Sequence, residues 1–140
     1  MKHIVDYIRE ALVGEVNGFC ILKPEFLDYE SDFDDMLKNN GWQIVQKVKK
    51  TLSIEEAKEL YISKQEESYY GDLCKYMASG DSISYLLYKD VKDPVKDLEK
   101  IKEKVRKTWG KDEMKNAMHS SDSIENVNRE YKLILQNKII

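Results

Sequence analysis

The amino-acid sequence predicts a two-layer α/β sandwich, in which helices cover one face of a mainly antiparallel sheet. Strand-like and helix-like segments alternate along the chain in the order β-α-β-(α)-β-α-β. The chain has 140 residues and 41% hydrophobic content, which is enough for one core. It contains no internal repeat, low-complexity tract or Pro/Gly-rich linker, so residues 1–140 are expected to form a single domain.

The first half of the chain contains four predicted elements. Apolar residues recur at helical spacing over residues 3–12, which indicates a short amphipathic helix. The segment "FCILKP" (19–24) is apolar and ends in proline, as a buried strand does. A helix is predicted over 32–41, where Asn-Gly stops it, and the alternating segment 42–52 is predicted to be a strand.

The second half continues the alternation. A helix is predicted over 53–67, because Ser53 and Glu56 form a capping-box pattern. Residues 82–90 are predicted to be a strand.

Two further helices and a last strand complete the pattern. Asp93 precedes proline at the start of a helix that is expected to run to about residue 107. A final helix is expected to start near Asp122, with Glu125 completing a second capping box. The apolar run "KLIL" (132–135) is a candidate final strand.

The charge balance argues against a nucleic-acid partner. The chain carries 23 basic and 26 acidic residues, a net charge of -3. No apolar run approaches the roughly 18 residues that a membrane span needs, and charges interrupt the N-terminal apolar stretch, so neither a membrane partner nor a signal peptide is expected. Cys20 and Cys74 are interpreted as reduced, buried thiols, which predicts a cytoplasmic protein.

Common phosphate and metal motifs are absent from the sequence. It has no G-x-x-x-x-G-K-[ST] and no G-x-G-x-x-G, and its two histidines and two cysteines lack zinc-site spacing. His119 nevertheless stands just before a predicted helix start, where backbone N–H groups favour anions. Histidine can act as a nucleophile toward phosphorus. The residues alone leave open a lone turn histidine without function.

Five blocks of the sequence resemble the nucleoside diphosphate kinase family. The most informative block is "NAMHSSDSIENVNREYKLIL" (116–135), which is similar to the family's active-site pattern N-x-x-H-G-S-D-S and the helix that follows it. The other four are "FCILKPEFL" (19–27), "NNGWQIVQKVKKTLSIEEAKELY" (39–61), "SYYGDLCKYMASG" (68–80) and "VRKTWG" (105–110). They occur in the family's order and cover roughly residues 18–135. Residues 1–17 are then expected to be an added helical extension.

The resemblance implies a ferredoxin-like α/β sandwich with a four-stranded, mainly antiparallel sheet covered by helices. It also implies a ping-pong kinase, in which a histidine carries the γ-phosphate of a nucleoside triphosphate to a nucleoside diphosphate. Mg²⁺ is expected on the phosphates, with no metal held by the chain alone, and a homo-oligomer is expected.

The family's site residues can be carried over by position. His119 would be the phosphorylated nucleophile, and Ser121 and Glu130 would orient it. Lys23 and Asn116 would contact the ribose hydroxyl, and Lys23 would also offset phosphate charge.

Three more residues complete the implied nucleotide site. Tyr61 would support Lys23 and the histidine pocket, Arg106 would hold phosphate oxygens, and Tyr69 would stack on the base. Without the resemblance, the tyrosines would be interpreted as core or rim aromatics and Arg106 as a helix-end cation.

The sequence departs from the family pattern at several places. Ser120 replaces the glycine after the histidine, and Met114 replaces the glycine of the family's Gly-Arg-Asn turn. The segment between Gly80 and Arg106 is shorter than usual, so that the loop with a phosphate-binding threonine is missing. Glu99 and Lys100 stand near the place of a second phosphate-binding arginine, and Lys100 is the candidate substitute.

These departures keep two other interpretations open. The chain could be a catalytically weak or inactive family member that binds nucleotides or proteins, or an unrelated ferredoxin-like binding module.

Overall fold

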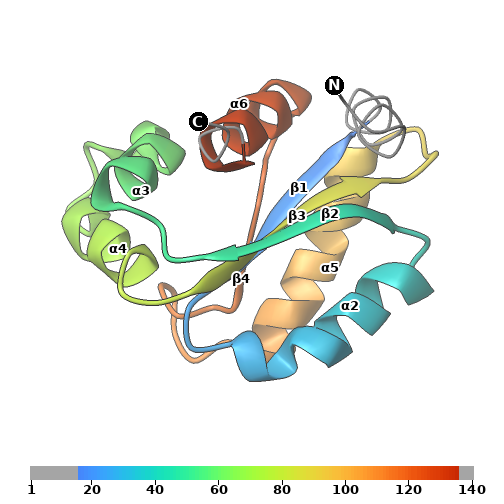
Figure 1. Ribbon diagram of the computed structural model, residues 1–140, viewed down its shortest axis with the longest axis horizontal. Coiled ribbons are helices and arrows are strands. Elements are labelled where there is room, and N and C mark those ends of the chain that lie inside the picture. Colours follow the sequence, from blue (N-terminus) through green and yellow to red (C-terminus); the bar gives the residue numbers. More distant parts are fainter. Residues whose placement is uncertain (1–15, 136–140) are drawn as a thin grey trace, which may run out of the picture.

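A four-stranded antiparallel sheet in the order β2-β3-β1-β4 forms the centre of the protein (Figure 1). The computed structural model describes residues 16–135. The strands are β1 (Gly18–Leu22), β2 (Gln43–Lys50), β3 (Ser82–Tyr88) and β4 (Met118–Ser120). This sheet with its helices confirms the predicted ferredoxin-like α/β class.

Five α-helices and two 3-10 turns connect the strands within the described residues. The helices are α2 (Glu30–Asn39), α3 (Ile54–Leu60), α4 (Tyr70–Met77), α5 (Pro94–Trp109) and α6 (Ile124–Leu135). The 3-10 turns are η1 (Leu27–Tyr29) and η2 (Ile62–Lys64). The helix expected over 3–12 lies outside the described residues, and none of the described helices is long and apolar enough to cross a membrane.

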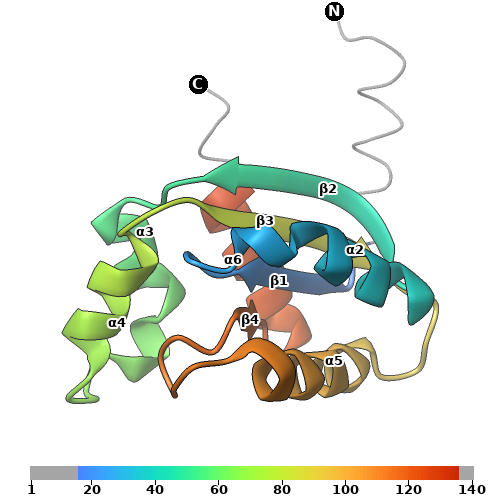
Figure 2. The same cartoon turned by 90° about the horizontal axis from the view of Figure 1, so that it is seen from below.

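Helices cover both faces of the sheet, so the expectation of one covered face is wrong. On one face, α3, α4 and α6 pack on Phe19 and Ile21. On the other, α2 and α5 pack on Cys20 and Leu22, and in Figure 2 α2 lies in front of the sheet and α6 behind it. The physical reason is that β1 is apolar at every position, so both of its faces need a covering layer.

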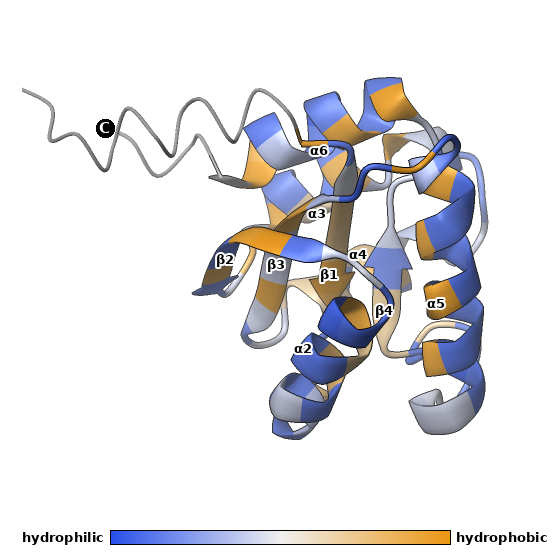
Figure 3. Ribbon diagram, turned by 90° about the vertical axis from the view of Figure 1, so that its right-hand side faces the viewer, coloured by the Kyte–Doolittle hydropathy of each residue, from blue (hydrophilic) through white to orange (hydrophobic). Residues whose placement is uncertain are grey.

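Helix α5 shows how local signals and tertiary packing agree. Its N-cap is Asp93, whose side chain accepts a hydrogen bond from the Lys96 N–H, as predicted. Leu98, Ile101 and Val105 are buried against the sheet. Figure 3 shows hydrophobic positions on the side of α5 that faces the sheet, and hydrophilic positions on its outer side.

The C-terminal expectations need two corrections. Residues 132–135 are the end of α6 rather than a strand, because the buried Val127, Tyr131 and Ile134 repeat at helical spacing. The fourth strand is the short β4, which sequence patterns did not predict. The α6 helix starts one residue later than expected, since Ser123 Oγ accepts from the Asn126 N–H at 3.1 Å in the N-cap position. The Asp122–Glu125 capping box is therefore not formed.

Two further differences concern the segment between β2 and β3. The predicted helix over 53–67 already ends at Leu60, although its Ser53–Glu56 capping box is formed as expected. Helix α4 was not predicted. Its Cys74 and the Cys20 of β1 are both buried and unpaired, which confirms the interpretation of free thiols.

Candidate active site

One cavity of about 740 Å³ opens where β4 meets α3, α4, α5 and α6. It gathers residues that lie far apart in the sequence. Seven of the eight site residues predicted from the sequence line it, namely Lys23, Tyr61, Tyr69, Arg106, Asn116, His119 and Glu130. The eighth, Ser121, is buried but lies outside this lining, and its hydroxyl has no hydrogen-bond partner among the described residues.

Backbone contacts between β1 and β4 bring Lys23 and His119 together. His119 is paired with Ile21 across the sheet, and the Lys23 N–H donates to the Ala117 carbonyl at 2.8 Å. Ala117 has a φ of +77° and forms a γ-turn, in which the Met118 N–H donates to the Asn116 carbonyl. This left-handed conformation is costly for a residue with a Cβ, and it places Asn116 at the cavity wall.

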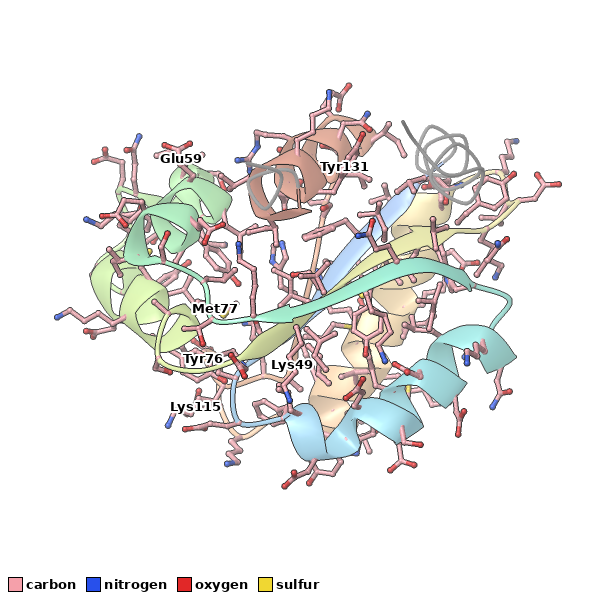
Figure 4. All side chains as sticks on the ribbon, viewed as in Figure 1. Lys49, Glu59, Tyr76, Met77, Lys115 and Tyr131 are labelled. Atoms are coloured by element: carbon pink, nitrogen blue, oxygen red, sulfur yellow. The ribbon has the colours of Figure 1, made fainter. Side chains whose placement is uncertain are left out.

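The turn after β1 is tied to α4 and to the loop before β4. The Tyr76 hydroxyl donates to the Pro24 carbonyl at 2.5 Å. Lys115 lies 3.5 Å from the Glu25 carboxylate and 5.8 Å from the centre of the Tyr76 ring, and Figure 4 shows Tyr76 and Lys115 beside each other. Three separate segments are therefore joined next to Lys23 and Met114, which line the cavity.

His119 is held in one orientation by Glu130. A hydrogen bond joins the His119 Nε2 atom to Glu130 Oε1, so the other ring nitrogen, Nδ1, is left for a ligand. The Tyr61 ring meets the imidazole edge-on, with ring centres 5.2 Å apart. Burial lowers the pKa of His119 below its ordinary value, although Glu130 opposes the shift. The ring is therefore neutral at pH 7, the form in which it can act as a nucleophile.

Arg129 links the Glu130 carboxylate to the end of α3. Its guanidinium lies 3.8 Å from Glu130 Oε2 and donates to the carbonyls of Glu59 and Leu60 at 2.9 and 3.4 Å. These carbonyls belong to the last turn of α3, where an α-helix has no i+4 N–H donors for its carbonyl groups. The same contacts fix the position of Tyr61, the next residue along the chain.

Positive charges converge on the cavity wall opposite α6. Lys23 is buried and donates to the Met114 carbonyl at 3.3 Å. The pKa of Lys23 is lowered to about 7, mainly by burial and in addition by the positive charges of Arg106, Lys102 and Lys64. A bound anion would relieve both the burial cost and the repulsion among these groups.

Two polar atoms of the cavity lack partners within the described part of the chain. They are the Tyr61 hydroxyl and Asn116 Oδ1, both buried. Burial raises the pKa of Tyr61, so its hydroxyl stays protonated and can donate. Asn116 Nδ2 already donates to the Glu113 carbonyl at 2.7 Å, which leaves Oδ1 as an acceptor. Buried polar atoms are rarely unpaired, so these two indicate a missing ligand.

Two aspects of the site differ from the sequence prediction. Lys100, the candidate for a missing phosphate contact, is exposed and does not line the cavity, whereas Lys102 does. The signal was available, because Lys102 precedes Arg106 by four positions and so shares its helix face. Tyr61 was expected to support both Lys23 and the histidine pocket; its ring contacts His119, whereas its hydroxyl makes no hydrogen bond to Lys23.

Comparison with known proteins places the chain in a family. The sequence model described as "Nucleoside diphosphate kinase" matches residues 17–140. The chain belongs to the nucleoside diphosphate kinase family. A bacterial relative, the nucleoside diphosphate kinase of Helicobacter pylori, is 29% identical over 120 residues, with coverage of 79% of this chain and 88% of its own length. The first 16 residues lie outside the family match.

Solved structures share the fold. The nucleoside diphosphate kinase of Aquifex aeolicus superposes with a TM-score of 0.76 at 26% identity, covering 84% of this chain and 93% of that chain. That of Encephalitozoon cuniculi has a TM-score of 0.73 at 19% identity, with 88% and 90% covered, which shows the fold alone.

Other relatives are longer than this chain. Human "Nucleoside diphosphate kinase homolog 5" is 27% identical over 132 residues, which span 86% of this chain but only 62% of the relative. A sea-urchin relative, "Thioredoxin domain-containing protein 3 homolog" of Heliocidaris crassispina, is 34% identical over 116 residues, or 72% of this chain and 14% of the relative. The chain thus spans less than two thirds of the length of these proteins.

Proposed function

We propose that this chain is a nucleoside diphosphate kinase, which transfers the γ-phosphate of a nucleoside triphosphate to a nucleoside diphosphate through phosphorylated His119. The observation that carries the proposal is the pair of His119 and Glu130 beside the converging cations. Glu130 holds Nε2, the ring is neutral, and Nδ1 is left for attack. A neutral, oriented imidazole next to a positively charged wall is suited to phosphoryl transfer.

In the first half-reaction, His119 Nδ1 attacks the γ-phosphorus. The Nδ1–P bond forms, the bond to the β-phosphate oxygen breaks, and the diphosphate leaves. The ring keeps the proton on Nε2 and gains positive charge, which the Glu130 carboxylate stabilises. In the second half-reaction, a terminal oxygen of another diphosphate attacks the same phosphorus. The new O–P bond forms, the Nδ1–P bond breaks with its electron pair returning to Nδ1, and His119 becomes neutral again.

The cationic wall would hold the phosphates. Arg106 donates to the Met118 carbonyl through Nε at 3.1 Å, which fixes its guanidinium at the cavity. Lys23 would take up a proton as the anion binds, and the Tyr61 hydroxyl would donate to a phosphoryl oxygen.

The remaining residues would hold the nucleoside. Asn116 Oδ1 can accept from a ribose hydroxyl. Tyr69 is 41% exposed at the cavity rim, so one ring face is free to stack on a base. Stacking tolerates every base, which predicts little base selectivity. Ser121 as an orienting partner of His119 stays a prediction.

Mg²⁺ would enter on the nucleotide phosphates. Within residues 16–135, no three His, Cys, Asp or Glu side chains lie close enough together to hold a metal ion by themselves. Mg²⁺ commonly uses one or two carboxylates together with substrate phosphates and water. Asp122 lines the cavity and fits this role, so the donor set is compatible with the ion. When bound, Mg²⁺ would neutralise phosphate charge.

Phosphoenzyme formation tests the proposal. Incubation with γ-labelled ATP and magnesium should give an acid-labile, base-stable label on the native protein. His119→Ala should abolish it, whereas His3→Ala should keep it. No label on the native protein at millimolar ATP would exclude the kinase activity.

The second candidate is a weak or inactive family member that binds nucleotides or proteins. It is favoured by the short segment between Gly80 and Arg106 and by the serine at position 120. This candidate predicts nucleotide binding without phosphoenzyme. A homo-oligomer and a cytoplasmic location stay predictions, and light scattering of the purified protein would test the first.

A further inference from the structure

Helix α5 brings a second cation to the cavity one turn before Arg106. Lys102 and Arg106 are four residues apart, so their side chains leave the helix on the same face. Both are half-buried and line the cavity. Two like charges at this spacing repel each other, so the isolated helix gains nothing from the arrangement.

Lys102 also has no hydrogen-bond or ion-pair partner among the described residues that would stabilise its charge in the cavity. Its ammonium makes no hydrogen bond or ion pair within residues 16–135. Burial lowers the pKa of Lys102, and Arg106 lowers it further, while Glu99, Asp122 and Glu103 only partly oppose the shift. The positive charge of Lys102 in turn lowers the pKa of Lys23 and of His119, so it acts across the cavity.

We propose that Lys102 is a phosphate-binding residue of this cavity, which compensates for contacts that the shortened segment between Gly80 and Arg106 does not supply. Its ligand would be the phosphate chain of a nucleoside di- or triphosphate, so the proposal rests on the proposed function. Lys102 and Arg106 together form a two-pronged cationic clamp on one rigid helix. A bound anion attracts both cations, and this attraction offsets the repulsion between them.

Lys100 provides a matched control on the same helix. It is two positions away, exposed and outside the cavity lining. The experiment compares the native chain with Lys102→Ala, Lys102→Arg and Lys100→Ala. Displacement of a fluorescent ADP by ADP and by pyrophosphate measures affinity for the phosphate chain, and thermal unfolding without ligand measures stability.

Lys102→Ala should weaken binding of ADP and of pyrophosphate by roughly ten- to a hundredfold, the usual loss for one charged hydrogen bond. Lys102→Arg should stay within about threefold of the native chain, because it keeps the charge. Lys100→Ala should have no effect. The Tm of Lys102→Ala without ligand should not fall, since the substitution removes repulsion. If Lys102 had a purely structural role, its loss would lower the Tm.

Equal affinities for Lys102→Ala and Lys100→Ala would overturn the assignment, as would a loss in Lys102→Ala that Lys102→Arg does not restore. The binding readout is independent of catalysis. If the native chain binds ADP but is never phosphorylated, the kinase function fails and the Lys102 assignment is still decided by the variants. If the native chain binds neither ADP nor pyrophosphate, both proposals fail.

Discussion

The imidazole of His119 and the carboxylate of Glu130 determine the pH range in which the candidate site can work. Burial holds the pKa of His119 below its ordinary value, so the ring becomes protonated only under more acidic conditions. At saturating ATP, whose phosphates keep Lys23 protonated, we therefore expect the rate of phosphoenzyme formation to be level from about pH 8 down to about pH 6.5, the ordinary pKa of histidine. It should decline only at lower pH.

The substitution Glu130→Gln removes the negative charge of this side chain and keeps its shape. The carboxylate raises the pKa of His119, both by its hydrogen bond and by its charge, so its loss should move the acid decline to still lower pH. The level rate should fall by on the order of 10–100-fold, since a charged hydrogen bond is worth about 1.5–3 kcal/mol. The measurement is the pH profile of labelling.

Glu125→Gln is the control, because Glu125 is exposed on the same helix and lies outside the cavity lining. Its profile should match that of the native chain. A shift of the acid decline to higher pH in Glu130→Gln would contradict the role given to Glu130.

Single residues were predictable where the family pattern fixes them by position. The seven predicted residues that line the cavity come from five segments of the chain. Lys102 was not predicted, because the comparison with the family pattern pointed to Lys100, although the four-residue spacing between Lys102 and Arg106 already places both on one helix face. The partnerless Tyr61 hydroxyl and Asn116 Oδ1 were also beyond sequence patterns, since hydrogen bonds depend on residues distant in the chain.

Among the secondary-structure elements, those whose ends are marked by capping residues, proline or glycine in the sequence were predicted well. Helix α5 starts after Asp93, with Pro94 as its first residue, and α2 ends before Gly41, whose φ of +86° suits glycine. Strand β4 carries no such signal. It has three residues and exists because its backbone pairs with β1, which is a tertiary contact. The apolar run at 132–135 is equally compatible with strand and helix over so short a length.

The capping box of α3 should contribute stability without contributing to ligand binding. Ser53 Oγ accepts from the Glu56 N–H at 3.0 Å, and Glu56 Oε1 accepts from the Ser53 N–H at 3.0 Å. Ser53→Ala should lower the free energy of unfolding by about 0.5–2 kcal/mol, the usual value of an N-cap. The affinity for ADP should not change, because Arg129 holds the other end of α3. Urea unfolding and ADP titration measure the two quantities.

Thr108→Ala is the matched control for the loss of a hydroxyl. Thr108 Oγ1 donates to the Lys104 carbonyl of its own helix, a contact that adds little stability. Its cost should stay within about 0.5 kcal/mol. A cost equal to that of Ser53→Ala would show that the capping box has no special contribution.

At the scale of the whole molecule, the cluster of cations in the cavity lining is a local exception in an acidic protein. The net charge of the chain is -3, yet Lys23, Lys64, Lys102 and Arg106 all line one cavity. The fold brings them together because the end of β1, the η2 turn and one face of α5 meet at this cavity. The hydrophobic cores on both faces of the sheet offset the repulsion among these four cations. Part of the folding stability is therefore used to hold the cations together before an anion binds.

This arrangement makes the stability of the ligand-free protein depend on pH. The pKa of Lys23 is about 7 in the folded chain and near 10.4 in an unfolded one, so between these values the unfolded chain binds more protons. The free energy of unfolding should therefore rise from pH 7 to pH 8, by roughly 1 kcal/mol from this group. Above this range the buried thiols of Cys20 and Cys74, whose pKa burial raises, oppose the trend.

Lys23→Met should flatten this slope, because methionine fills a similar volume and carries no proton. Lys100→Met, on the exposed face of α5, should leave the slope unchanged. Saturating ADP should also flatten the slope in the native chain, since the bound phosphates keep Lys23 protonated in the folded state. Urea unfolding at pH 7.0, 7.5 and 8.0 provides the measurement. If Lys23→Met keeps the native slope, a group other than Lys23 causes the pH dependence of the free energy of unfolding. Lys23 would then not be the group that takes up a proton when phosphate binds.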